Sequence, residues 1–251
     1  MSHHYIRFDN VRYMYPNGYE ALKGVSFQIN HGEKVALVGA NGAGKSTLVL
    51  HTNGLLLPTE GGVNVGDIPV CKRTLPIVRQ TVGLVFQNQD DQLFMPTVEE
   101  DVAFGPLNMR LPPAEVERRV TTSLEAVGAL ALRKRVGNQL SGGQKRSVAI
   151  ATVLSMEPNI LVMDEPSSNL DPKARRQIIN LIRSFNHTCI IATHDLEMVW
   201  ELCERTIVMN DGRVIADAPT QEIFYNKSLL EQSGLEQPYQ AILARYVREV
   251  I

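Results

Sequence analysis

Residues 35–46 read VALVGANGAGKS: an apolar run, Val35 to Val38, leads directly into a glycine-rich loop that ends in Lys45 and Ser46. The loop matches the pattern G-x-x-x-x-G-K-[ST] in full, and it stands between a predicted strand and a helix that begins near Lys45. Glycines let such a backbone curl until its N–H groups point at phosphate oxygens, and the helix N-terminus adds partial positive charge. We therefore predict a nucleotide site at this loop, in preference to a glycine-rich turn without a ligand.

The loop also carries the charged and hydroxyl groups that a nucleotide with its metal ion requires. Lys45 is expected to bridge the β- and γ-phosphates, and the Ser46 hydroxyl is expected to ligate Mg²⁺. The predicted cofactors are therefore ATP and Mg²⁺. The loop residues expected to contact the nucleotide are Gly39, Asn41, Gly42, Gly44, Lys45, Ser46 and Thr47.

Further short runs that are apolar on both faces follow along the chain, at residues 82–86, 160–163 and 189–192. Such runs are typical of buried parallel strands, and helix patterns lie between them. This alternation predicts an α/β fold with a mainly parallel central sheet. Residues before about 35 read as short β segments of an antiparallel N-terminal part, and Asp211-Gly212 marks a hairpin between 206–209 and 213–216.

The helix signals divide the chain further. The stretch from about 88 to 151 is nearly all helical and is expected to form a lobe inserted into the sheet. Within it, Thr97 with Glu100 forms a plausible capping box, and a helix is expected to open at Pro113 and stop at Gly128. We expect a nucleotide-binding domain over residues 1–220 and a short helical tail over 221–251.

Two acids end the apolar run at 160–163. Asp164 is expected to hold Mg²⁺ through its water shell, and Glu165 is positioned to deprotonate an attacking water as a general base. A strand that ends in Asp-Glu is often only a capped loop. The pair is a stronger indication of a catalytic site here because it stands some 120 residues after a phosphate-binding loop.

Polar residues also follow two other predicted strands. His194 could reach the γ-phosphate and hold both the water and Glu165 in line. Gln87 could ligate Mg²⁺ and the water, and so sense the γ-phosphate. For each of these side chains, an ordinary structural role at a strand end is the alternative.

The segment Leu140-Ser141-Gly142-Gly143-Gln144 predicts a second anion-binding helix end. Ser141 and Gln144 form a capping box, yet two glycines in a helix's first turn cost about 1 kcal/mol each relative to alanine. Close approach of bare N–H groups to a phosphate would justify that cost. Because the chain already has its own phosphate loop, this end is expected to serve ATP held by a second ATPase subunit, in a head-to-tail pair; an unusually flexible cap is the alternative.

Composition excludes several classes of protein. The net charge of −2, with 21% charged residues, provides no basic face for nucleic acid. Three cysteines without metal-ligand spacing fit a reduced, cytosolic setting. No stretch approaches the roughly 18 apolar residues of a membrane helix, and no apolar signal region begins the sequence, so any work at a membrane is expected to be peripheral, on its cytoplasmic face, through partner subunits.

Taken in order, these motifs resemble those of the nucleotide-binding domain of ATP-binding-cassette (ABC) transporters, over about residues 5 to 220. In that resemblance, Tyr15 falls where the family places an aromatic ring against adenine, although a buried strand tyrosine is the alternative. The other matches are residues 39–46 with the Walker A loop, Gln87 with the Q-loop, 140–144 with the signature motif, 160–165 with Walker B and its catalytic acid, 168–171 with the D-loop, and His194 with the H-loop.

The sequence around and after Gln87 is similar to that of the energy-coupling-factor importers, which take up vitamins or transition-metal ions. The similarity covers residues 85–94 and 97–106, and the resemblance implies that integral membrane subunits dock near Gln87 to Pro106. An importer of cobalt or nickel is the implied function. The sequence departs from this branch at Ser147, where an arginine is common, and at Ser167-Ser168-Asn169.

Other functions remain as alternatives. A soluble ABC ATPase of DNA repair or translation would carry long inserts or a second cassette, whereas Lys45 and Ser141 are only about 96 residues apart. A P-loop kinase would have no use for the second glycine-rich helix end. An exporter, or an importer of other cargo, would preserve all of these motifs.

Overall fold

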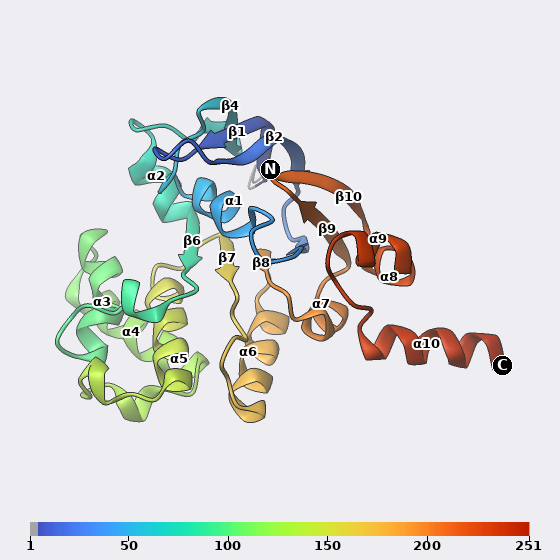
Figure 1. The fold of residues 1–251 in the computed structure, drawn as a ribbon. Helices are drawn as coiled ribbons and strands as arrows, with labels where there is room; N and C mark the ends of the chain where they lie inside the picture. The colour runs from blue at the N-terminus through green and yellow to red at the C-terminus, as the bar shows by residue number, and fades with distance from the viewer. Residues whose placement is uncertain (1–4, 251) are drawn as a thin grey trace.

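A six-stranded sheet forms the centre of the protein, which is seen in a computed structural model that describes residues 5–250 (Figure 1). The strand order is β10-β9-β3-β8-β7-β6, and all neighbours are parallel except β9 and β10. The predicted α/β fold with a mainly parallel sheet is therefore confirmed. The strands are β3 (Lys34–Val38), β6 (Val82–Val85), β7 (Ile160–Asp164), β8 (Thr188–Ala192), β9 (Arg205–Asn210) and β10 (Arg213–Pro219).

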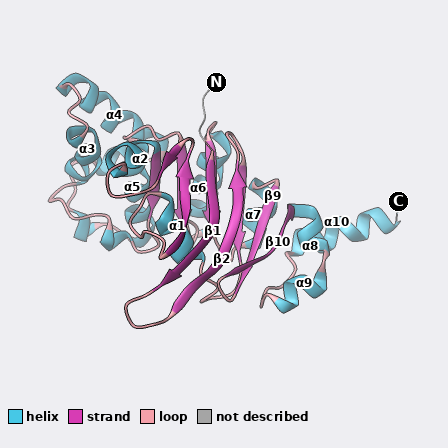
Figure 2. Ribbon diagram, turned by 90° about the horizontal axis from the view of Figure 1, so that it is seen from above, coloured by secondary structure: helices cyan, strands magenta, loops and turns pink. Residues whose placement is uncertain are grey.

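A second, four-stranded antiparallel sheet covers one face of the first, with the order β2-β1-β4-β5 (Figure 2). Its strands are β1 (Ile6–Met14), β2 (Glu20–Ile29), β4 (Glu60–Val65) and β5 (Ile68–Pro69). The sequence predicted short β segments here, but β1 and β2 have 9 and 10 residues. They pair along most of their length because Pro16-Asn17-Gly18 supplies the connecting turn.

Helices pack on both faces of the parallel sheet, as two-sided apolar strands require. One core joins the two sheets to α1, and the other joins the opposite face of the parallel sheet to the remaining large helices. The helices are α1 (Lys45–Thr52), α2 (Leu75–Thr81), α3 (Val98–Asn108), α4 (Pro113–Ala126), α5 (Gly142–Leu154), α6 (Pro172–Ser184), α7 (Leu196–Leu202), α8 (Thr220–Tyr225), α9 (Lys227–Gln232) and α10 (Tyr239–Val250), with 3₁₀ turns η1 (Gln89–Asp91), η2 (Leu130–Leu132) and η3 (Gly137–Gln139).

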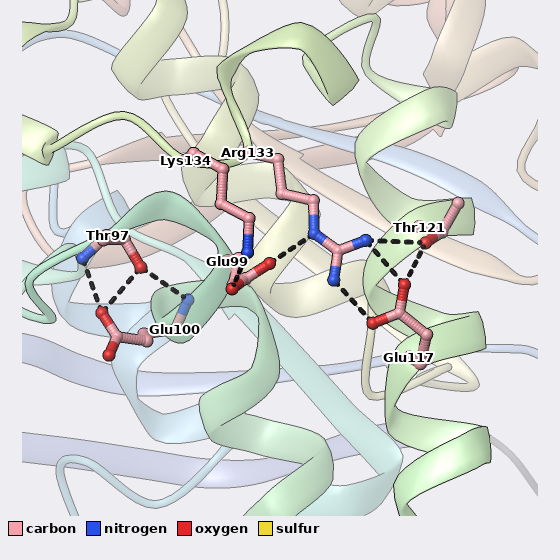
Figure 3. A network of polar contacts seen from close by, with 7 residues as sticks. All are labelled: Thr97, Glu99, Glu100, Glu117, Thr121, Arg133 and Lys134. Atoms are coloured by element: carbon pink, nitrogen blue, oxygen red, sulfur yellow. Dashed lines mark hydrogen bonds and ion pairs between the residues drawn. The ribbon is translucent and has the colours of Figure 1, made fainter.

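Helices α3, α4 and α5 lie together beside the end of the sheet where β6 and β7 emerge (Figure 1). An ion-pair network ties this group together, because Arg133 contacts both Glu99 of α3 and Glu117 of α4 (Figure 3). The hydrogen bonds from Arg133 hold the pKa of Glu117 near 2, well below its ordinary value. The capping box of Thr97 and Glu100 starts α3 next to this network, as predicted.

Two other local features are a helix start at Asp171 and the hairpin that Asp211-Gly212 predicted. Asp171 accepts the N–H of Ala174 and starts α6. Asp211 and Gly212 both have positive φ, 44° and 71°, as a two-residue type I′ hairpin between β9 and β10 requires.

Two further findings concern the rest of the chain. The C-terminal segment packs on the main body, where Phe224 stacks on Trp200 of α7 with ring centroids 6.2 Å apart. The start of α10 contacts α7 and α8, and Ala241 is fully buried there, whereas the far end of the helix extends away from the body (Figure 2). Within residues 5–250, no helix has the length and apolar character needed to span a bilayer.

Candidate active site

The glycine-rich loop connects β3 to α1, and close backbone packing explains two of its glycines. A Cβ atom on Gly39 would lie 2.2 Å from the carbonyl oxygen of Met209, and one on Gly44 would lie 2.8 Å from that of Ala21. Gly42 has open space around it, but its φ of +83° favours glycine. The loop can therefore wrap tightly only with glycine at these positions.

Lys45 lies inside the curl of this loop. Its Nζ donates to the carbonyl oxygens of Gly39 at 2.7 Å and Ala40 at 3.1 Å, and the residue is only 6% exposed. Burial lowers the pKa of Lys45, although the nearby carboxylates of Glu165 and Asp164 act to raise it. The ammonium group is thus held where a polyphosphate would enter the loop.

The two acids at the end of β7 have different surroundings. Asp164 is buried, and its Oδ1 has no hydrogen-bond partner among the described residues. Burial raises the pKa of Asp164, whereas a hydrogen bond from Ser46 lowers it. An unpaired carboxylate oxygen beside a serine hydroxyl fits the ligand set of Mg²⁺, which prefers carboxylate, hydroxyl and water oxygens.

Glu165 is held by the loop that follows β8. Its Oε1 lies 2.9 Å from Nδ1 of His194, and its Oε2 accepts the hydroxyl of the fully buried Thr193 at 3.0 Å. The backbone of Glu165 has a φ of +49°, rare for a residue with a side chain, and its N–H donates to the carbonyl of Ala192. These contacts fix the carboxylate in one orientation at the strand end, next to His194.

A cavity of about 500 Å³ brings most of the predicted residues together, within the usual size range of ligand sites. Gln87 and Glu165 both line it, whereas Gly39, Asp164 and His194 are not among its lining residues. The hydroxyl of Tyr15 lies 3.0 Å from Oγ1 of Thr47, and Tyr15 follows the last residue of β1, so it is not a buried strand tyrosine. The lining residues are Tyr15, Tyr19, Ala21, Asn41, Gly42, Gly44, Lys45, Ser46, Thr47, Gln87 and Glu165.

Tyr19 also lines this cavity, although the sequence interpretation did not identify it. The N–H of Tyr15 donates to the carbonyl of Tyr19 across the turn, so both side chains project from the same hairpin tip. Their rings are nearly parallel, with an angle of 18° and centroids 6.4 Å apart. The spacing of two tyrosines around Pro16-Asn17-Gly18 was the available signal. Both rings offer a face on which a base can stack, worth about 1–3 kcal/mol per base.

The second glycine-rich segment lies outside this cavity: none of Ser141, Gly142, Gly143 and Gln144 is among its described lining residues. The predicted capping box is present, because the Ser141 N–H donates to Oε1 of Gln144 and the Gln144 N–H donates to Oγ of Ser141. A Cβ atom on Gly142 would meet nothing within 4 Å, and one on Gly143 would make only ordinary contacts. Packing within the chain therefore does not explain either glycine.

Three positioning side chains near Glu165 were also missed from the sequence. Arg175 of α6 forms a two-armed ion pair with Asp195, and Ser167 donates to the same carboxylate. Burial acts to raise the pKa of Asp195, but hydrogen bonds from Arg175 and other donors hold it below its ordinary value. This network joins the segment after Glu165 to the segment that carries His194. The pairing of β7 with β8 and the packing of α6 against α7 bring these segments together, which no local pattern encodes.

Comparison with known families and proteins gives one consistent result. Residues 22–168 match the family model described as "ABC transporter". A Geobacter sulfurreducens protein named as an ABC transporter ATP-binding protein is 63% identical over 95% of this chain and 96% of its own length. The energy-coupling factor transporter ATP-binding protein EcfA of Methanocaldococcus jannaschii is 46% identical over 91% of this chain and 84% of its own.

Solved structures agree with these relatives. CbiO1 from Clostridium perfringens, described as part of the ABC transporter complex CbiONQ, has a TM-score of 0.78 and 38% identity, covering 96% of this chain and 98% of that one. The ATP-binding cassette MJ0796, solved as a dimer in a post-hydrolysis state with ADP and Pi, has a TM-score of 0.76 and 31% identity, covering 86% of this chain and 98% of that one.

Proposed function

Because the chain belongs to the ABC transporter family and is one of its ATP-hydrolysing subunits, we propose that it powers an energy-coupling importer of transition-metal ions such as cobalt or nickel. The observation that carries the catalytic part is the contact between His194 and Glu165, because Glu165 lines the same cavity as Lys45. A general base beside a phosphate-binding loop is what ATP hydrolysis requires.

In this proposal, the nucleotide lies in the cavity with its phosphates in the loop at 39–46 and its base against Tyr15. ATP with Mg²⁺ is the family's cofactor set, and a bound Mg²⁺ would supply positive charge that offsets the negative charge on the phosphates. Ser46, Gln87 and Asp164 are the residues that would hold the ion. Glu165 takes a proton from the attacking water, and His194 orients the carboxylate and the γ-phosphate.

The subunit is proposed to work as a head-to-tail pair, with an identical copy or a paralogue. Ser141 to Gln144 of one subunit would then cover the ATP held by the other. Two observations support this arrangement: none of residues 141–144 lines its own chain's cavity, and the packing of the described residues does not account for Gly142 and Gly143. A related cassette, MJ0796, was solved as a dimer.

A groove beside the Q-loop supports docking of a membrane subunit. It has a volume of about 560 Å³ and runs between the parallel-sheet body, at β6 and α2, and helices α3 and α5. Phe94 and Phe104 meet edge to face at its mouth, 62% and 42% exposed. Asp101 fixes this rim, because it is buried and accepts the N–H groups of Phe94 and Met95 at 3.0 Å. We propose that the groove receives a segment of an integral membrane subunit, near Gln87 to Pro106, so that the ATPase sits on the cytoplasmic face of the cell membrane.

Replacing Phe94 and Phe104 with Ser is expected to separate ATP hydrolysis from transport. The isolated double variant should hydrolyse ATP at the wild-type rate, because neither ring lines the nucleotide cavity, but its membrane subunits should no longer co-purify with it. Ile215→Ser, which removes a similarly exposed apolar side chain on β10, is the control. Full recovery of the complex with the double variant would exclude this groove as the docking site.

The positions of the nucleotide cavity and of the groove also bear on the domain organisation of the chain. We propose a nucleotide-binding domain over residues 1–220, with the helical group at about 88–151 as the lobe that carries both the groove rim and Ser141 to Gln144. Residues 221–251 would form a separate tail. The position of these helices between β6 and β7 in the sequence supports this division.

The cargo is proposed from the resemblance of residues 85–94 and 97–106 to the energy-coupling-factor importers, and the relatives named EcfA and CbiO1 support that type of transporter. Cells that express this subunit with its membrane partners are expected to accumulate labelled Co²⁺ or Ni²⁺ several-fold above cells that carry the Glu165→Gln variant. Uptake of a labelled vitamin without uptake of either metal ion would reject the metal cargo. It would leave the ATPase assignment intact and favour the alternative, an ABC importer of other cargo.

A further inference from the structure

Arg146 of α5 is a buried cation whose function is not explained by the proposed catalytic site. It is 2% exposed and is among the largest fully buried side chains of the protein. Its Nη1 donates to the carbonyl oxygen of Phe86 and its Nη2 to that of Gln87, each at 2.9 Å. Its Nε has no hydrogen-bond partner among the described residues.

The surroundings of this guanidinium are unusual for a buried charge. Among the ion pairs of the described residues, none joins Arg146 to a carboxylate within 4.0 Å. Burying an unpaired ion has an effective penalty of several kcal/mol. Burial lowers the pKa of Arg146, whereas the charges of Asp164 and Glu165 act to raise it. Arginine stays protonated in proteins, so a fixed positive charge stands close to the proposed catalytic carboxylates.

The side chain of Gln92 also holds the backbone of Phe86, through the N–H group of that residue. Oε1 of Gln92 accepts the N–H of Phe86 at 3.0 Å, and its Nε2 donates to the carbonyl of Ala149 and to Oγ1 of Thr152 on α5. Both backbone polar groups of Phe86 are therefore bonded to side chains that connect it to α5. Helix α5 and the backbone at 86–87 are joined by hydrogen bonds rather than by apolar packing alone.

We propose that Arg146 is a positioning residue for ATP hydrolysis. It holds the backbone of Gln87 so that this residue stays on the rim of the nucleotide cavity, and it connects Gln87 to the helix whose first turn carries Ser141 to Gln144. A change at either end is then transmitted to the other through two hydrogen bonds of 2.9 Å. The inference rests on the role proposed above for Gln87. The inference also bears on Ser147, which stands where an arginine is common in the family. In this chain the arginine is the preceding residue, Arg146, and it donates to the backbone of Gln87.

The test is a double-mutant cycle between Arg146→Met and Gln87→Ala. Arg146→Met keeps the volume but removes both donors and the charge, and we expect it to lower kcat for ATP by about tenfold, equivalent to about 1.4 kcal/mol. If Arg146 acts through Gln87, adding Arg146→Met to Gln87→Ala should cause little further loss. Multiplied losses in the double variant, or a wild-type rate in Arg146→Met, would overturn the proposal.

A readout that does not depend on hydrolysis completes the experiment. Amide hydrogen exchange at 86–92 should become faster in Arg146→Met, while ATP binding without Mg²⁺ should be unchanged, because the loop that holds Lys45 is untouched. Ser147→Ala, on the same helix, is the matched control. Should Arg146→Met fail to fold, Arg146→Lys keeps the charge and one donor and enters the same cycle. Unchanged exchange in a folded Arg146 variant would refute the positioning role, whereas an inactive wild type would instead refute the proposed function.

Discussion

Glu165→Gln is expected to slow ATP hydrolysis by about 10²- to 10⁴-fold, the usual contribution of a positioned general base, while ATP remains bound. The amide has nearly the same shape as the carboxylate, so it can still accept the hydroxyl of Thr193, now 3.0 Å from Oε2. It cannot accept a proton from water. Phosphate release under saturating ATP measures the loss, and retention of labelled ATP measures binding. A normal rate of phosphate release would remove Glu165 as the base.

The same variant tests whether ATP is shared between two subunits. With hydrolysis blocked, ATP should hold Glu165→Gln as a stable dimer, detectable by light scattering, because the ATP that joins the two subunits is no longer hydrolysed. Adding Ser141→Arg should abolish that dimer while each monomer still binds ATP, because a bulky side chain would occupy the exposed helix end. A Glu165→Gln variant that stays monomeric with saturating ATP would contradict the head-to-tail arrangement. A dimer that persists despite Ser141→Arg would contradict the assigned contact surface.

Local signals in the sequence were sufficient to predict the parts of the site that lie at strand ends. The loop before Lys45 and the run before Asp164 are each contiguous, and their residue types determine both conformation and chemistry. The parallel sheet then brings them together, because the carboxyl ends of β3, β7 and β8 meet at the same edge. For this reason Glu165 and His194, 29 residues apart, could be predicted to meet.

Other contacts could not be predicted because they depend on packing between distant segments. No role was predicted for Arg146, yet it donates to a backbone carbonyl 60 residues away. Tyr19 was passed over because only the pairing across the hairpin tip places its ring beside that of Tyr15. Arg175 reaches Asp195 only once α6 and α7 are packed together. Each of these side chains has a common structural alternative, so its residue type alone carries little information.

Lys45→Ala is expected to abolish nucleotide binding at the concentrations that saturate the wild type. Removing one partner of a buried, hydrogen-bonded charge pair costs about 2–5 kcal/mol, which corresponds to about thirtyfold or more in affinity. Calorimetric titration with ATP measures the loss directly. Lys227→Ala, which removes an exposed lysine on α9 with a side chain that is 72% exposed, is the control and should bind ATP normally. Retained affinity in Lys45→Ala would contradict the assignment of the loop.

The stability of the nucleotide-free variant separates this prediction from simple unfolding. Burial lowers the pKa of Lys45 in the folded protein, so the unfolded chain holds the Lys45 proton more tightly than the folded chain does. By linkage, the charge destabilises the fold at pH values below the folded-state pKa, and this penalty disappears as the pH rises through the pKa of the unfolded chain. Removing the ammonium removes the penalty, at the expense of two hydrogen bonds to loop carbonyls. We therefore expect Lys45→Ala without nucleotide to unfold at a urea concentration no lower than that of the wild type.

Only the wild type should then gain stability when ATP is added, because ligand binding stabilises the state that binds it. A large loss of stability without nucleotide would mean that Lys45 serves mainly to hold the loop together.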